Sequence, residues 1–247
     1  MLRYLLKRLL ALIPVLLGVA FLIFTMMYFT PGDPAAMVLG DQASEEQLNE
    51  WRAARDLDKP FLEQFGKYIW GIVSQGDFGI SYKTGKNVTS ALLERFPTTF
   101  VLAIATCVIA MVLGVLLGIL AANHQGTWID SVLRVFGMAG VSMPIFWLGL
   151  LMILWFAVDL KWFPVSGWYG PKYLVLPALT MGLTFTASLM RTTRSSMLDC
   201  IRQDYVITAR AKGQKERVIT YHHVFRTALI PIITAAGSAF GIALCGA

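Results

Sequence analysis

The sequence predicts an all-α polytopic membrane protein with five membrane-spanning helices. Hydrophobic residues make up 56% of the chain and charged residues only 15%, which is far from the composition of soluble domains. The hydrophobic residues also gather in long runs without Asp, Glu, Lys or Arg. Each run reaches the roughly 18 to 25 residues that a helix needs to cross about 30 Å of hydrocarbon. The five runs are Leu9 to Phe29, Thr98 to Ala122, Phe136 to Val158, Tyr173 to Met190 and Thr227 to Ala247.

The first run follows Arg3, Lys7 and Arg8, an arrangement that secretory signal peptides share. The apolar region of a signal peptide is about 7 to 15 residues long and ends at a small-x-small cleavage site. The run here is longer and ends in Thr30-Pro31-Gly32-Asp33. We therefore interpret it as an uncleaved span.

Basic residues beside the spans indicate the orientation of the chain. Lys and Arg in short loops are enriched on the cytoplasmic side of a membrane. The N-terminus and the loop 191–226, which carries eight basic residues against three acids, are therefore expected to be cytoplasmic. The net charge of +6 has the same origin and indicates no nucleic-acid partner. Alternation places 30–97 and 159–172 outside and a short turn, 123–135, inside, which divides the chain into an N-terminal span (1–29), an external segment (30–97) and a transmembrane core (98–247).

The external segment has the pattern of a folded, helical insertion. Glu45 to Asp56 is rich in helix-forming residues. After Pro60, four large apolar residues recur at spacings of four, three and four, which aligns them on one face of a helix. We expect this face to pack on the membrane-embedded part of the chain. The four residues are Phe61, Phe65, Tyr68 and Ile72, and turns are predicted at 76–79 and 84–86.

No residue pattern marks a catalytic, metal or cofactor site. Cys107, Cys200 and Cys245 lack the CxxC or Cys/His spacing of zinc sites. Gly79 to Asn87 superficially resembles a phosphate-binding loop, but the spacing is one residue too long and Asn87 stands where Ser or Thr is needed. We therefore predict no cofactor and no enzymatic activity in this chain.

The energy for transport is expected to come from another protein. A carrier driven by protons or sodium usually keeps ionisable residues inside its spans. The five runs contain no acidic or basic residue. A self-contained channel or secondary carrier is therefore the less favoured alternative. A membrane scaffold whose basic loop binds a non-ATPase partner is a further alternative.

The loop 191–226 is the candidate contact with such a partner, because helix connections usually take only about two to eight residues. Apolar residues recur every four positions at Met197, Ile201, Tyr205 and Ala209, which predicts a helical run that ends at Gly213. A second helical segment is predicted from Glu216 to Ala228. Small Ala209 and Ala211 would permit close approach by another protein, with Arg210 and Lys212 at the rim. Composition alone fits a docking surface and a basic surface for anionic lipid equally well.

The residues of this loop also resemble a known motif. Asp204-Tyr-Val-Ile-Thr-Ala-Arg-Ala-Lys-Gly213, followed by His223 and Arg226-Thr-Ala-Leu-Ile-Pro231, resembles the "EAA" cytoplasmic loop of permease subunits in binding-protein-dependent ABC importers. The variant is that of the dipeptide, oligopeptide and nickel subfamily. Other landmarks of the subfamily follow in the same order along nearly the whole chain: 8–18, 31–35, Gly76-Asp-Phe-Gly-Ile-Ser-Tyr82, Arg95-Phe-Pro-Thr-Thr99, 142–149 and 162–167.

The resemblance implies a type I ABC importer transmembrane domain in the bacterial inner membrane. Its partners would be a second homologous permease, two cytoplasmic ATPase subunits and an extracytoplasmic solute-binding protein. The loop would dock on an ATPase, and ATP hydrolysis would occur on that partner chain. By position, the coupling residues would be Asp204, Tyr205, Ala209, Arg210, Ala211, Lys212 and Gly213, with His223 and Arg226 supporting the return helix.

The chain departs from the subfamily pattern in the motif and in length. Thr208 replaces the leading Glu of the general motif, as is usual in the subfamily, and Gln214-Lys215 stands where Leu-Ser is common. The subfamily has six spans whereas five fit here, so a truncation before the last span is expected. Peptide is the substrate that the resemblance favours, with nickel chelates or sugars as alternatives.

Overall fold

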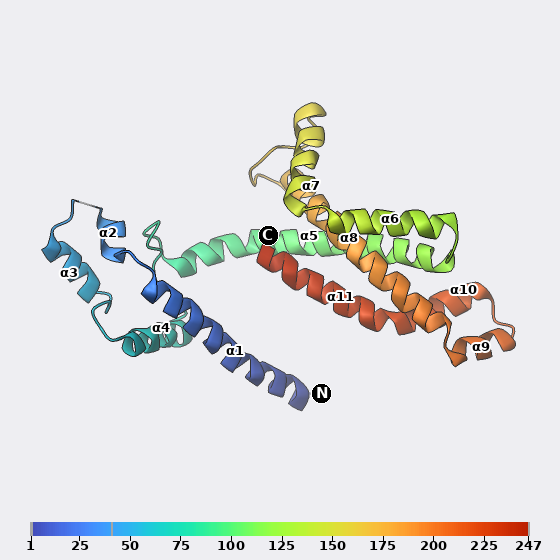
Figure 1. The fold of residues 1–247 in the computed structure, drawn as a ribbon, viewed down its shortest axis with the longest axis horizontal. Coiled ribbons are helices and arrows are strands. Elements are labelled where there is room, and N and C mark those ends of the chain that lie inside the picture. The colour runs from blue at the N-terminus through green and yellow to red at the C-terminus, as the bar shows by residue number, and fades with distance from the viewer. Residues whose placement is uncertain (1, 41, 247) are drawn as a thin grey trace. The chain divides into compact units, whose positions relative to one another are not determined.

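The computed structural model describes residues 2–40 and 42–246, and these residues are almost entirely helical. The one isolated β-bridge found in the described ranges joins Ile80 to Asn87. The chain divides into two compact units, Met1–Arg95 and Phe96–Ala247. Figure 1 shows the helices of both units along the chain. The predicted all-α membrane fold is confirmed.

The first unit contains α1 (Leu2–Phe29), α2 (Pro34–Leu39), α3 (Glu45–Ala53) and α4 (Phe61–Gln75). Side chains cap the two short helices. Asp33 accepts hydrogen bonds from the first backbone N–H groups of α2, and Ser44 forms a capping box with Gln47 at the start of α3. Arg52 pairs with Asp33 at 2.6 Å and lowers the pKa of that carboxyl below its usual value. The pair links α3 to the start of α2.

Aromatic side chains attach α4 to α1, as the spacing of its apolar residues predicts. Phe61, Phe65 and Tyr68 meet Phe21 and Phe24 with ring centroids 5.3 to 5.7 Å apart, mostly edge to face. Such pairs stabilise beyond the apolar area that they bury. The helix α4 is therefore packed on the C-terminal half of α1.

Among the residues that the structure describes, four helices are long and apolar enough to cross a membrane, or five if a bent pair counts as one span. They are α1, α5 (Val88–Asn123), α8 (Pro171–Ile201) and the last helix, which runs from Glu216 to Gly246 and consists of α10 (Glu216–Val218), η2 (Ile219–Val224) and α11 (Phe225–Gly246). The bent pair is α6 (Trp128–Ser142) followed by α7 (Ile145–Met152) and η1 (Ile153–Asp159). The predicted set of five spans corresponds to these elements.

The predicted third span, 136–158, is wrong in shape, because α6 and the helix after it are bent by 100°. The bend falls at Met143 and Pro144. Proline has no backbone N–H for the helical ladder and pushes the preceding residue towards extended backbone, and Met143 has φ −75° and ψ 127°. The run is apolar throughout, so its composition gives no sign of the break.

Two predicted boundaries are also wrong. α5 begins at Val88, ten positions before the uncharged run, and carries Glu94, Arg95 and Pro97 within the helix. The predicted inner turn, 123–135, shrinks to 124–127 because α6 begins at Trp128. The predicted spans contained no charged residue because each was defined to end at the nearest charged residue. The helices continue past these residues.

Small residues bring α5 and α8 into close contact. A Cβ atom on Gly114 would lie 2.7 Å from the Cβ of Leu189, and one on Gly118 would lie 2.5 Å from the Cβ of Thr193. This small-xxx-small pair therefore packs α5 against α8 within the chain. On the other side of α8, Gly140 approaches Ala187 in the same way. α8 is the central helix of the second unit.

Candidate functional site

The basic loop folds as a helix, a short helix and a return helix. α8 continues through Ile201, and a break at Arg202 and Gln203 separates it from α9 (Asp204–Ala211). The predicted single helical run from Met197 to Gly213 is therefore wrong, because Gln203 has extended backbone. The predicted segment from Glu216 to Ala228 is helical but is the beginning of the last span helix. Figure 1 shows α9 and α10 where α8 ends and the return helix begins.

α9 is held to the core by one of its faces. Val206 is 0% exposed and Ala209 8% exposed, and both belong to the apolar cluster that contains Met197, Ile219 and Val224. Ala209 therefore packs against its own chain. Of the two small residues predicted to permit close approach by another protein, Ala211 is the exposed one.

The opposite face of α9 presents apolar surface. Ile207 lies on this face and is 61% exposed, whereas Tyr205 lies at the edge of the buried face, one turn before Ala209, and is 38% exposed. Because α9 is fixed from behind by fully buried side chains, these two residues are presented at a defined position. The sequence prediction missed Ile207. Val206 and Ala209 are three positions apart and share the buried face, so Ile207 points away from that face.

The turn after α9 is closed by polar contacts on both sides. The backbone at Gly213 has φ +74°, and its N–H donates to the Arg210 carbonyl at 2.9 Å. Arg210 Nε and Nη2 donate to the two carboxylate oxygens of Glu216 at 2.8 and 3.3 Å, and this carboxylate raises the pKa of Arg210. His223 Nε2 lies 2.8 Å from Gln214 Oε1. These contacts tie α9 to the start of the return helix.

The structure brings most of the predicted coupling residues together. Asp204, Tyr205, Ala209, Arg210 and Ala211 lie on α9, Lys212 and Gly213 form the turn, and His223 contacts that turn. Arg226 is exposed one helical turn further on, with no carboxylate within 4.0 Å in the described ranges. The predicted role of Arg226 in supporting the return helix remains a prediction. Sequence reasoning also missed Val206, Gln214 and Glu216.

Positive charge surrounds α9. Several exposed basic residues lie in or next to the turn, and most have no carboxylate partner among the residues that the structure describes. Such a rim favours an acidic partner surface and speeds its association. The basic residues are Arg202, Arg210, Lys212, Lys215 and Arg217.

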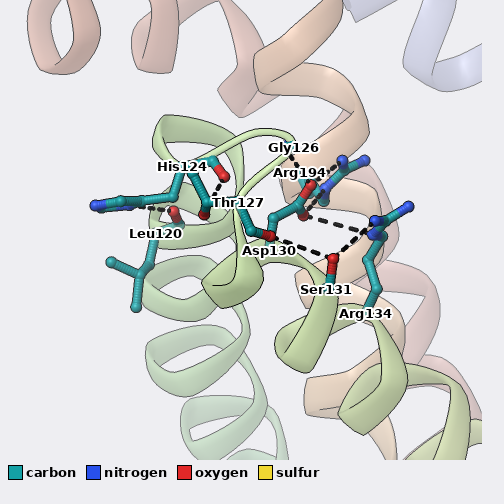
Figure 2. Close-up of polar contacts among 8 residues, drawn as sticks. All are labelled: Leu120, His124, Gly126, Thr127, Asp130, Ser131, Arg134 and Arg194. Carbon is teal, nitrogen blue, oxygen red and sulfur yellow. Dashed lines mark hydrogen bonds and ion pairs between the residues drawn. The ribbon is translucent and has the colours of Figure 1, made fainter.

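A second polar cluster lies behind this site, between the α5–α6 turn and α8 (Figure 2). Asp130, in the first turn of α6, is 1% exposed. Its two carboxylate oxygens accept hydrogen bonds from Arg194 Nε and Nη2 at 2.7 and 2.8 Å, and the Gly126 N–H donates to it at 3.1 Å. Arg134 is further away, at 3.7 Å. Sequence reasoning missed this pair because it assigned Asp130 to a loop.

Neither cluster has the ligands of a metal centre. Among residues 2–40 and 42–246, no group of three or more His, Cys, Asp or Glu side chains is arranged to hold a metal ion. Cys107, Cys200 and Cys245 are free thiols.

Comparison with known proteins agrees with this geometry. The family model described as "Binding-protein-dependent transport system inner membrane component" matches residues 114–247, and the model for its N-terminal part matches residues 1–103. The glutathione transport system permease protein GsiC of Escherichia coli K12 is 39% identical over 246 residues, covering 100% of this chain and 80% of that protein. The GsiC protein of Salmonella typhi is 40% identical over the same shares. The chain therefore belongs to the inner-membrane permease components of binding-protein-dependent ABC importers, in the subfamily that transports peptides and nickel.

Proposed function

We propose that this permease subunit imports short peptides and receives its energy from a cytoplasmic ATPase that docks on α9. The observation that carries the proposal is the geometry of α9. Val206 and Ala209 fix one face to the core, Ile207 stands out from the opposite face, and Tyr205 is partly exposed at the edge of the buried face. An exposed apolar side chain on a rigid support, with basic residues around it, fits a groove in a partner protein.

The distribution of buried charge favours an external energy source. Asp130 is the one charged residue that is buried in the described part of the chain, and Arg194 neutralises it with two hydrogen bonds. A proton- or sodium-coupled carrier needs a carboxylate that releases and rebinds its ion during transport. A carboxylate held by a guanidinium at the end of a helix is poorly suited to that role.

The partners follow from the family and from the loop. A second homologous permease, two ATPase subunits and an external solute-binding protein would complete the importer. The relatives are named for glutathione transport, which supports a short peptide as substrate. The basic loop and the basic N-terminus support a cytoplasmic position for both. Closure of the two ATPases would move α9 and, with it, the helices on which it is mounted.

The variant Ile207→Asp tests this proposal. A charge at the centre of an apolar interface would remain desolvated, so we expect the affinity for the ATPase to fall by about 30-fold and ATP-driven peptide uptake to fall with it. The folded chain should be unaffected, because Ile207 is 61% exposed. Co-purification of the ATPase from detergent extracts and uptake of labelled glutathione into vesicles measure the two effects.

Tyr221→Asp is the matched control. Tyr221 is 56% exposed and lies two positions after the buried Ile219, so it faces away from α9. We expect it to bind the ATPase as the wild type does. Equal co-purification of the Ile207→Asp and wild-type chains would rule out docking on α9, and a wild-type chain that never recruits an ATPase would favour the scaffold or channel alternatives.

A further inference from the structure

The Asp130–Arg194 pair joins two helices that are far apart in the sequence. Asp130 opens α6, and Arg194 lies on α8, shortly before the break that leads to α9. The carboxylate is 1% exposed, whereas 21% of the Arg194 side chain is exposed. Figure 2 shows the guanidinium reaching from α8 to the carboxylate beneath the α5–α6 turn.

The bidentate geometry fixes one relative position of α6 and α8. Two parallel N–H···O bonds form only when the planar guanidinium and the carboxylate lie side by side. A buried ion pair adds little net stability compared with apolar packing, but removal of one partner leaves an uncompensated charge. The main effect of the pair is therefore to fix the position of α6 along α8. The small residues elsewhere in the α6–α8 contact do not fix this position.

Small residues lie in the α6–α8 contact nearer the bend. A Cβ on Gly140 would lie 2.9 Å from the Cβ of Ala187, and one on Gly137 would lie 2.4 Å from the terminal methyl of Met190. Backbones that approach over glycine and alanine pack closely but offer few steps that oppose sliding. The ion pair between Asp130 and Arg194 opposes sliding where α6 begins and α8 approaches its C-terminal end.

We propose that Asp130 and Arg194 are positioning residues that make α6 move with α8, so that motion imposed on α9 reaches the bent span of α6 and α7. This inference rests on the proposed docking of the ATPase at α9. The path has four parts: α9, the end of α8, the ion pair, and α6 up to the 100° bend at Met143 and Pro144. Without the pair, α8 moves and α6 lags behind.

The chain supplies a matched control for the test, because two arginines face the same carboxylate. Arg194 bridges from α8, whereas Arg134 lies on α6 itself, four residues after Asp130, and is 53% exposed. Arg194→Gln and Arg134→Gln each remove one guanidinium from Asp130, but only the first disconnects the helices. Arg194→Lys keeps the charge and loses the two-pronged geometry, and Asp130→Asn removes the charge while it keeps the size.

The test uses the assembled importer with its ATPases and binding protein, in lipid vesicles. For Arg194→Gln and Asp130→Asn we expect ATPase recruitment and ATP hydrolysis as in the wild type, but about tenfold less glutathione transported per ATP. Arg194→Lys should fall between them and the wild type, and Arg134→Gln should match the wild type. A purely structural role would lower the amount of assembled importer and leave the ratio of transport to hydrolysis unchanged.

A distance measurement reads the coupling directly. Spin labels are attached to cysteines introduced at Val132 and Asp199, both exposed, after the three native cysteines are replaced by serine. In the wild type and Arg134→Gln we expect one narrow distance distribution that is the same with and without ATP. In Arg194→Gln the distribution should broaden or shift when ATP is added.

The outcomes separate this inference from the proposed function. If the wild type recruits the ATPase and transports, and Arg194→Gln matches Arg134→Gln in both transport per ATP and label distance, the positioning role is wrong and the proposed function stands. If the wild type recruits no ATPase, the proposed function fails first and the inference fails with it.

Discussion

Gly118→Ala is expected to lower the free energy of unfolding of the purified chain by about 3 kcal/mol, because overpacking in a close helix contact cannot be relieved by side-chain rotation. The added Cβ would lie 2.5 Å from the Cβ of Thr193 and 2.8 Å from the carbonyl oxygen of Met190. Thr193 is 0% exposed and has no space to retreat. α5 and α8 would have to separate along their length. Denaturant titration in detergent micelles, followed by tryptophan fluorescence, measures the effect.

Gly237→Ala is the control for this prediction. Gly237 also lies inside a membrane-spanning helix, α11, but no atom lies within 4 Å of a Cβ built there. Alanine is favoured over glycine within a helix by about 1 kcal/mol, so this variant should be as stable as the wild type or slightly more stable. Equal loss of stability in both variants would contradict the close α5–α8 contact.

Gly213→Pro is expected to reduce ATP-driven uptake by about tenfold or more while the chain stays in the membrane at the wild-type level. Proline holds φ near about −65°, whereas residue 213 has φ +74°. Proline also removes the N–H that donates to the Arg210 carbonyl. The turn between α9 and the return helix would open, and the Arg210–Glu216 pair would lose its alignment. Vesicle uptake and quantitative immunoblotting of the membrane fraction give the two readouts.

Gly213→Asn separates conformation from the mere loss of glycine. Asparagine tolerates the left-handed region better than other side chains, and nothing lies within 4 Å of a Cβ at this position. Uptake by this variant should stay within about twofold of the wild type, since the strain is of order 1 kcal/mol and the fold is retained. If the proline variant transports as well as the asparagine variant, the geometry of this turn has no part in coupling.

The sequence predicted the membrane class and the number of spans because both depend on composition over long windows. It also predicted that α4 packs on a membrane helix, since the repeat of Phe61, Phe65 and Tyr68 puts three aromatic side chains on one face. The bend at Pro144 was not predicted, because a proline inside an apolar run kinks some helices and is tolerated in others. Helix ends were misplaced where the helix continues past the last apolar residue, as at Val88 and Trp128.

For the candidate site, resemblance located the segment but did not orient it. The motif spans Asp204 to Gly213, and the repeat of four placed Tyr205 and Ala209 on one stripe with Met197 and Ile201. The break at Gln203 separates α9 from that stripe, and the buried residues of α9 are Val206 and Ala209, so Ile207 faces outward. The Asp130–Arg194 pair spans 64 positions in the sequence and has no local signal. Long-range partners of this kind depend on tertiary packing, which a single sequence does not display.

The orientation of α9 also decides how the basic residues of the loop are used. Arg210 is engaged by Glu216 and closes the turn, so it contributes less free charge than its position in the motif indicates. Lys212 and Arg217 are exposed on either side of that turn. Exposed charges act mainly on the rate and specificity of association, whereas an apolar residue desolvated at the centre of an interface contributes most to affinity. The contact of Ile207 with a partner is therefore the central claim.

Site-specific photo-cross-linking from position 207 tests that claim most directly. A photoreactive amino acid replaces Ile207 in the assembled importer, and the same replacement at Tyr221, which is 56% exposed, serves as the control. Illumination is expected to join position 207 to the ATPase subunit, and to leave position 221 without this product. Cross-links from position 207 only to lipid, or equal ATPase cross-linking from both positions, would contradict docking on the outward face of α9.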